Sequence, residues 1–136
     1  MPHYLIRATL LGVVAQRLVR TLCTHCSDEG EIDTDEDLWR ELTTPWQLTP
    51  PGRMRAPVGC LECRNTGFYG RSGLYEILTL TPDLGELIVA DFDESALRHR
   101  AAREGMRPLR ISGADKVAQG VTSMDEVFKV APVGMD

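Results

Sequence analysis

Two short turns, Cys23-Thr-His-Cys26 and Cys60-Leu-Glu-Cys63, carry every cysteine of this chain. The sequence has 136 residues and 4 cysteines, and both turns have the Cys-x-x-Cys spacing. One such turn presents two thiolates to a metal ion, and two turns complete a tetrahedral Zn²⁺ shell with sulfur about 2.3 Å from the metal. The sequence therefore predicts one structural zinc ion bound by Cys23, Cys26, Cys60 and Cys63.

Other uses of four thiols compete with this interpretation. A pair of disulfides suits an oxidising compartment, and the N-terminal sequence lacks the order of a signal peptide. A rubredoxin-like iron site has similar sulfur geometry, whereas a redox-active Cys-x-x-Cys needs only one turn. A catalytic zinc keeps one position for water, but four thiolates close the shell. His25, inside the first turn, is a further candidate ligand that four sulfur atoms make unnecessary.

The segment before the first cysteine turn is strongly apolar. Its apolar side chains recur every four residues at Ile6, Leu10, Val14, Leu18 and Leu22. This spacing predicts an amphipathic helix over residues 3–22. The apolar arc is broad for a terminal helix, so we expect it to pack on material upstream in a longer protein.

The segment between the two turns, residues 27–58, is first acidic and then rich in proline. Leu38, Trp39 and Leu42 predict one short helix opened by Thr34. The prolines between residues 45 and 57 predict an irregular loop. Such an insert is compatible with one metal site, because the entropy cost of closing a loop grows only slowly with its length.

The chain after the second turn is expected to change from strand to helix. Gly67–Leu80 predicts two short strands around a glycine turn. Helix starts and ends are then indicated by Thr81, Asp93 or Asp91, Gly105, Pro108, Gly120 and the Ser123-Met-Asp-Glu126 capping box. The predicted class is α+β, mostly α: a zinc-stapled tetracysteine subdomain with a short β-hairpin, plus a C-terminal helical bundle.

Charge and hydropathy argue against nucleic-acid binding and against a membrane span. The formal net charge of −5 argues against nucleic-acid binding, which depends on neutralising many phosphates. No stretch has the roughly 18 uncharged apolar residues of a membrane span, so we expect a cytoplasmic protein without a direct membrane span. A partner protein is favoured. Its candidate contact is a basic cluster, although a solvated helix face is the more common origin of such a cluster: Arg98, Arg100, Arg103, Arg107 and Arg110.

Two further arginines and the remaining histidines complete the candidate residues. Zinc with four thiolates carries a charge of −2, and Arg20 and Arg64, beside the turns, are candidates to balance it or are simply exposed. His3 and His99 have no partner at a catalytic spacing. The sequence predicts no catalytic residue and no cofactor-binding residue other than the metal ligands.

Several segments together resemble one family. They are Leu11-Gly-Val-Val-Ala-Gln-Arg-Leu-Val-Arg-Thr-Leu-Cys-Thr-His-Cys26, Gly59-Cys-Leu-Glu-Cys-Arg-Asn-Thr-Gly-Phe-Tyr-Gly-Arg-Ser-Gly-Leu-Tyr-Glu-Ile-Leu78 and Gly105-Met-Arg-Pro-Leu109, and the ending Lys116–Val130 agrees with them. They resemble the C-terminal region of type II secretion ATPases (general secretion pathway protein E) and type IV pilus assembly ATPases of the PulE/PilB kind. The resemblance covers almost the whole chain and is poorest over residues 27–58.

The resemblance implies a function for a larger protein. Family members are hexameric motors that hydrolyse ATP at the cytoplasmic face of the inner membrane and drive secretion or pilus assembly. It carries metal ligation to the four cysteines and implies three parts: 1–22 from the end of the motor core, 23–80 as the tetracysteine subdomain with its variable insert, and 81–136 as a C-terminal helical subdomain. Implied partners are the motor core of the same chain, neighbouring subunits of the hexamer and inner-membrane platform proteins.

The motor's phosphate-binding loop has no counterpart in this sequence. Gly-x-x-x-x-Gly-Lys-Ser/Thr requires a lysine after glycine, whereas Lys116 follows Asp115 and Lys129 follows Phe128. ATP and Mg²⁺ are therefore expected only in the full-length parent, and this chain is expected to be noncatalytic. An autonomous zinc-binding adaptor for protein interaction remains the alternative. The sequence leaves open whether the parent serves secretion or pilus assembly.

Overall fold

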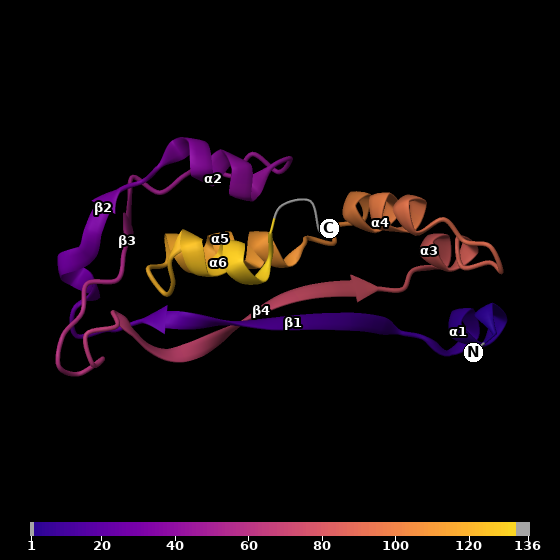
Figure 1. The fold of residues 1–136 in the computed structure, drawn as a ribbon. Coiled ribbons are helices and arrows are strands. Elements are labelled where there is room, and N and C mark those ends of the chain that lie inside the picture. The colour runs from indigo at the N-terminus through magenta and orange to yellow at the C-terminus, as the bar shows by residue number, and fades with distance from the viewer. Residues whose placement is uncertain (1, 133–136) are drawn as a thin grey trace. The chain divides into compact units, whose positions relative to one another are not determined.

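The computed structural model describes residues 2–132 and confirms the α+β class (Figure 1). Six α-helices, four strands and one 3-10 helix lie in this part of the chain. In order they are α1 (His3–Thr9), β1 (Gly12–Leu22), η1 (Ser27–Gly30), β2 (Glu31–Asp33), α2 (Glu36–Thr43), β3 (Arg53–Arg55), β4 (Phe68–Thr79), α3 (Pro82–Glu86), α4 (Glu94–Arg103), α5 (Leu109–Ala118) and α6 (Met124–Val130).

Two small sheets organise these elements. The long strands β1 and β4 pair and run in opposite directions (Figure 1). Near one end of the pair, the Leu80 N–H donates to the Leu11 carbonyl at 3.0 Å, and near the other, the Thr21 hydroxyl donates to the Tyr69 carbonyl. The short strands β2 and β3 form a separate antiparallel pair, with Ile32 opposite Met54.

The helix predicted over residues 3–22 is wrong beyond residue 9. Helix α1 ends at Thr9, and Gly12–Leu22 is strand β1. A repeat of four positions places its members on one face of a helix. It also places them on one face of a strand, because side chains an even number of positions apart point to the same side of a strand. Pairing with β4, more than 40 residues downstream, decides between them. Two residues of the strand are buried: Val19, at 1% exposure, lies off the repeat, and Leu22, at 4%, lies on it.

The prediction of a hairpin within residues 67–80 is also wrong. Phe68–Thr79 is one continuous strand, whose Gly70 and Gly73 lie inside it rather than at a turn. Gly73 is closely packed, because a Cβ there would lie 2.6 Å from the Tyr75 hydroxyl oxygen. A small two-stranded sheet does occur between residues 23 and 80, but β2 and β3 form it.

The described residues divide into two compact units. The first contains residues up to Ala15 together with Glu76–Arg107, and the second contains Gln16–Tyr75 together with the residues from Pro108 onward. Helices α3 and α4 belong to the first unit, and α5 and α6 to the second. The structure therefore does not show the single C-terminal helical bundle that the sequence predicts. The division into 1–22, 23–80 and 81–136 stays a prediction.

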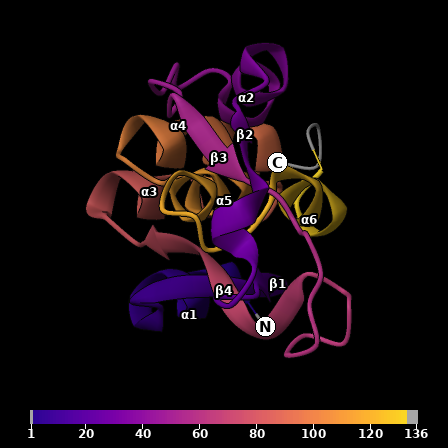
Figure 2. The same ribbon diagram turned by 90° about the vertical axis from the view of Figure 1, so that its left-hand side faces the viewer.

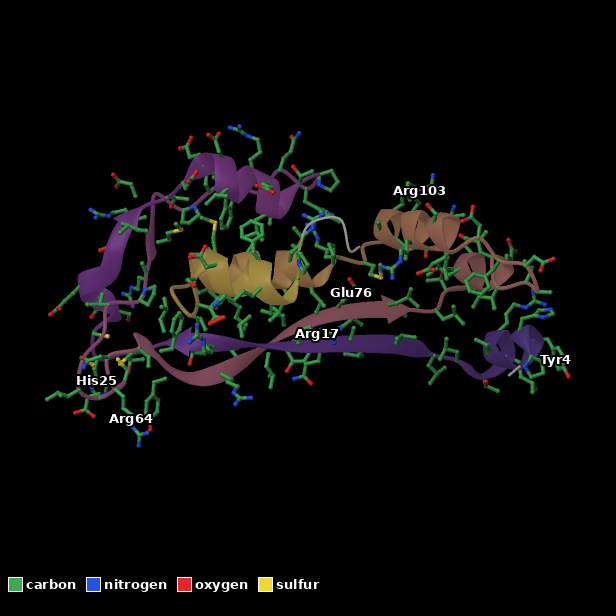
Figure 3. The ribbon with its side chains drawn as sticks, viewed as in Figure 1. Tyr4, Arg17, His25, Arg64, Glu76 and Arg103 are labelled. Atoms are coloured by element: carbon green, nitrogen blue, oxygen red, sulfur yellow. The ribbon has the colours of Figure 1, made fainter. Side chains whose placement is uncertain are left out.

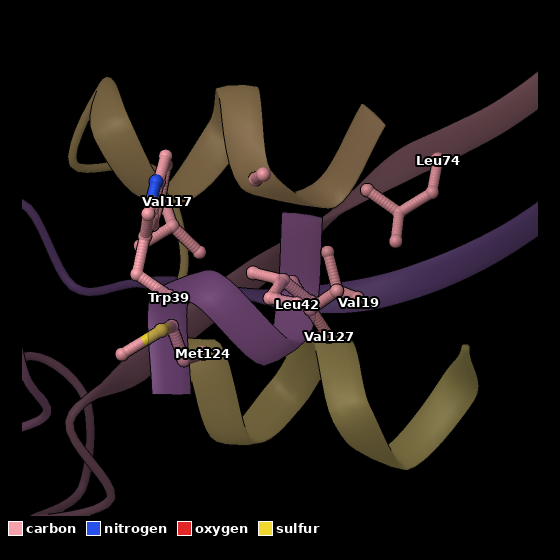
Figure 4. Packing of buried hydrophobic residues seen from close by; sticks show 8 residues of the cluster. Val19, Trp39, Leu42, Leu74, Val117, Met124 and Val127 are labelled. Carbon is pink, nitrogen blue, oxygen red and sulfur yellow. The ribbon is translucent and has the colours of Figure 1, made fainter. Parts of the chain in front are cut away.

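The second unit is layered, and its apolar core lies between the layers. Helices α5 and α6 lie side by side between α2 and the β1–β4 pair in both views (Figures 1 and 2). A close approach of α5 and α6 depends on Gly113, since a Cβ there would lie 2.4 Å from Val127. The cluster in Figure 4 includes the fully buried side chains of Val19, Leu42, Leu74, Val117 and Val127.

The first unit is smaller and has an apolar pocket that is open to solvent. Helices α1, α3 and α4 pack there with one end of each long strand, and the pocket has a volume of about 380 Å³. Its walls include Ile6, Leu10, Leu78, Phe92, Leu97 and Met106.

The helix caps confirm most of the starts expected from the sequence. The Thr81 hydroxyl accepts the Leu84 N–H, and the Asp93 carboxylate accepts the Ser95 N–H. Helix α2 is capped by Asp35 rather than by Thr34. Ser123 accepts the Glu126 N–H as a capping box requires, but the Glu126 carboxylate pairs with Arg20 instead of returning to the backbone of Ser123.

Candidate metal centre

The first cysteine turn continues directly from β1. Cys23 follows the last residue of the strand, and its N–H donates to the Gly67 carbonyl at 2.9 Å. The turn closes when the Ser27 N–H donates to the Cys23 carbonyl at 2.9 Å. Both cysteines of this turn are buried. The strand thus delivers two sulfur atoms to one point at its end.

The second turn is a tight reversal just before β4. The Asn65 N–H donates to the Cys60 carbonyl at 2.8 Å, and Arg64 and Asn65 have φ values of 57° and 63°. Asparagine tolerates this left-handed region better than most residues. The Thr66 hydroxyl donates to the Cys63 carbonyl at 2.8 Å, which fixes the exit into the strand.

The two turns bring their sulfur atoms together. All four Sγ atoms lie within 4.8 Å of one another, and they form the group of possible metal ligands found in residues 2–132. The Sγ–Sγ distances are 3.8 Å for Cys23–Cys60, 3.9 Å for Cys26–Cys63 and 3.7 Å for Cys60–Cys63. A tetrahedron with metal–sulfur bonds of about 2.3 Å has edges of about 3.8 Å. The four cysteines are thus close enough to bind one metal ion, and their donor set fits zinc.

The thiols differ in their tendency to ionise. Burial raises the pKa of Cys26 to about 11, although the backbone N–H of Gly59 works in the opposite direction. Burial also raises the pKa of Cys60. For Cys63, burial favours the neutral thiol, but hydrogen bonds from the backbone N–H groups of Cys60 and Gly67 outweigh it and lower the pKa to about 6. Cys63 is therefore ionised to the thiolate at neutral pH before a metal ion binds.

The residues proposed around the sulfur atoms have different roles. His25 is exposed and is not part of the sulfur group, and Arg64 is exposed at the same end of the unit (Figure 3). The Arg20 guanidinium pairs with Glu126 and lies 4.1 Å from the Phe68 ring centroid. Its partner is therefore a carboxylate, and its placement does not support a role in balancing the charge of the metal centre.

The basic cluster expected from the sequence is divided between separate contacts. Arg98 pairs with Glu94 at 3.3 Å, and Arg100 pairs with Asp83 at 2.7 Å. Arg110 belongs to the other unit, where it is buried. Arg110 is therefore not part of an exposed basic face.

Sequence reasoning missed the glycines that surround the sulfur atoms. Gly59 precedes Cys60, Gly67 follows Cys63 by four residues, and both have a positive φ. Their N–H groups donate to Cys26 and Cys63, respectively. The available clue was the position of these glycines beside a cysteine turn, where a backbone donor must approach a sulfur closely.

The fold and the site define a small α+β protein with a four-cysteine cluster of metal-binding geometry. The chain belongs to the type II/IV secretion system protein family, whose family model matches residues 1–129.

Curated relatives agree with this assignment. The chain is 44% identical to the type IV pilus assembly ATPase TfpB of Acinetobacter baylyi over 130 residues, which are 96% of this chain and 22% of that protein. It is 40% identical to the type II secretion system ATPase E of Vibrio cholerae over 127 residues, which are 93% of this chain and 24% of that protein. The chain thus spans about a quarter of the length of these relatives.

A membrane-crossing helix is not found among the described residues. None of the helices in residues 2–132 has both the length and the apolar character that a span requires.

Proposed function

We propose that this chain is a noncatalytic, zinc-binding part of a secretion or pilus assembly ATPase. The observation that carries the proposal is the cluster of four cysteine sulfur atoms at separations close to those of a tetrahedral zinc site. The ion would be held by Cys23, Cys26, Cys60 and Cys63. Bound zinc supplies folding energy rather than Lewis acidity, because four thiolates leave no position for a substrate or water.

The location of the cysteine turns supports a structural role. The first turn ends β1 and the second precedes β4, so a shared ion fastens the two paired strands at one end. The insert of residues 27–58 lies between the two cysteine turns in the sequence, and its helix α2 packs against α5. The metal centre thus closes the loop that carries the insert.

The absence of a phosphate-binding loop from the sequence supports a noncatalytic role. ATPases of this kind hold phosphates with backbone amides and a lysine that follows a glycine. Lys116 and Lys129 both follow other residues, and the sequence has no other lysine. ATP and Mg²⁺ would then bind to another part of a longer parent protein. The relatives are longer than this chain, which covers 22% of one and 24% of another.

The parent is proposed to be a hexamer at the cytoplasmic face of the inner membrane. In it, residues 1–22 continue from the motor core, 23–80 form the zinc-binding part and 81–136 follow as a helical part. Its partners are the motor core, neighbouring subunits and platform proteins in the inner membrane. The relatives' names as secretion and pilus assembly ATPases support this reading.

Nucleotide assays test the noncatalytic role. The purified 136-residue chain is expected neither to bind nor to hydrolyse ATP, whereas the longer parent does both. Cys23→Ser in the parent should reduce turnover or assembly while nucleotide affinity is kept, because zinc organises structure without stabilising transition-state charge. Hydrolysis by the purified chain that survives removal of contaminating ATPases would refute the proposal.

A further inference from the structure

Gly67 is hydrogen-bonded to one cysteine of each turn. Its N–H donates to the Cys63 Sγ at 3.2 Å, and its carbonyl accepts the Cys23 N–H at 2.9 Å. The residue is buried and immediately precedes β4. One residue thus connects the first cysteine of the first turn with the second cysteine of the second turn.

A side chain at this position cannot be accommodated without movement of the backbone. The φ of Gly67 is +83°, in the left-handed region that side chains disfavour. A Cβ would lie 2.4 Å from the Cβ of Pro57 and 2.8 Å from its Cα. Pro57 stands three residues before Cys60, so displacement of Pro57 would be transmitted to the second cysteine turn.

Both hydrogen bonds of Gly67 act on the geometry of the sulfur atoms. The bond to Cys63 stabilises its thiolate and fixes the direction of its lone pairs. The hydrogen bond from the Cys23 N–H to the Gly67 carbonyl fixes the position of the first turn relative to the residue before β4. Together they connect the Cys63 sulfur with the backbone of Cys23, and the sulfur atoms of these two residues lie within 4.8 Å of each other.

We propose that Gly67 is a positioning residue of the metal centre, which its two hydrogen bonds align before the ion binds. The proposal rests on the zinc-binding function proposed above and adds a residue that is not itself a ligand. Substitution of groups that orient metal ligands weakens metal affinity by about 10- to 100-fold in other proteins. A loss of this size is therefore expected for Gly67→Ala.

Zinc competition with a chromophoric chelator measures this loss in the full 136-residue chain. Two matched glycine substitutions serve as controls. Gly105→Ala introduces a side chain at φ +109° with no atom within 4 Å, so it tests backbone strain alone, and Gly52→Ala places one in open space. Both controls should stay within about twofold of the wild-type affinity. A Gly67→Ala affinity within that range, or an equal loss in Gly105→Ala, overturns the proposal.

A second measurement on the wild-type chain does not depend on the variant folding. With ¹¹³Cd²⁺ as the probe, an N–H···S–Cd hydrogen bond transmits scalar coupling from the amide proton to the metal. Cross peaks to cadmium are expected from the amide protons of Gly67 and Cys60, both of which donate to the Cys63 Sγ. A general folding role for Gly67 would not produce such a peak.

The outcomes separate this proposal from the zinc-binding function. A wild-type chain that takes up neither zinc nor cadmium contradicts the proposed function itself. A wild-type chain that binds cadmium with no coupling to the Gly67 amide contradicts only the positioning role.

Discussion

Arg20 of β1 pairs with the buried carboxylate of Glu126 on α6, across 106 residues of sequence. The Glu126 side chain is 6% exposed and that of Arg20 is 48% exposed. On the backbone beside this pair, the Thr122 hydroxyl donates to the Arg20 carbonyl at 2.7 Å. The strand that leads into the first cysteine turn is thereby joined to the start of α6.

Arg20→Gln should lower the free energy of unfolding by about 2 kcal/mol, because it leaves the buried Glu126 carboxylate without its cation. Chemical denaturation of the full chain measures the loss. The matched control is Arg17→Gln, an exposed arginine on the same strand, which should change stability by less than about 0.5 kcal/mol. Equal effects of the two substitutions would contradict a stabilising role for the pair.

Cys60→Ser should reduce amide protection most strongly near the metal centre and at the turn between α5 and α6. The physical link is the Leu22 N–H, which donates to the Val121 carbonyl at 2.8 Å and stands next to Cys23. Amides of α4 belong to the unit without the cysteines and should keep their protection. Hydrogen exchange followed by mass spectrometry resolves the two regions. Equal loss in both would show one cooperative structure instead.

Arg110→Met should destabilise the second unit by about 2 kcal/mol, since it removes the donor of a buried hydrogen bond. Arg110 donates to the Leu42 carbonyl at 2.7 Å, and its guanidinium lies 5.6 Å from the Trp46 ring centroid. Urea unfolding followed by tryptophan fluorescence reports this region. Arg103→Gln, on an exposed part of α4, is the control (Figure 3). An unchanged free energy of unfolding in Arg110→Met would show that the hydrogen bond to Leu42 does not stabilise the unit.

The number of protons released on zinc binding should increase by about one when the pH falls below 6. The pKa of Cys63 in the metal-free protein is lowered to about 6, so above this pH the group is already a thiolate. Below it, Cys63 carries a proton that the metal must displace, which also weakens apparent affinity. Calorimetry in buffers of different ionisation enthalpy, at about pH 5 and about pH 7.5, counts these protons. The same count at both values would contradict the lowered pKa.

The sequence predicted local features well because local chemistry determines them. The caps at Thr81, Asp93 and Ser123 depend on a side chain and the backbone two or three residues away. The four cysteines are likewise predictable as a group, because a metal ion selects the residue type as well as the spacing. Their actual convergence was visible only in the structure.

The long strands were not predictable in the same way. The pattern of apolar residues before Cys23 is compatible with a helix and with a strand, and the deciding partner, β4, lies far away in sequence. The same non-local pairing turns Gly70 and Gly73 from expected turn residues into strand residues. Glu126 shows a third case, because its capping-box spacing does not reveal that Arg20 competes for the carboxylate.

Metal analysis of the purified, reduced 136-residue chain shows whether Cys23, Cys26, Cys60 and Cys63 hold one zinc ion. Elemental analysis combined with native mass spectrometry should find one zinc ion per chain in protein purified without chelator, because four converging thiolates fill the metal's coordination shell. Less than about half an equivalent of zinc, or disulfides between the cysteine turns under reducing conditions, would contradict the account.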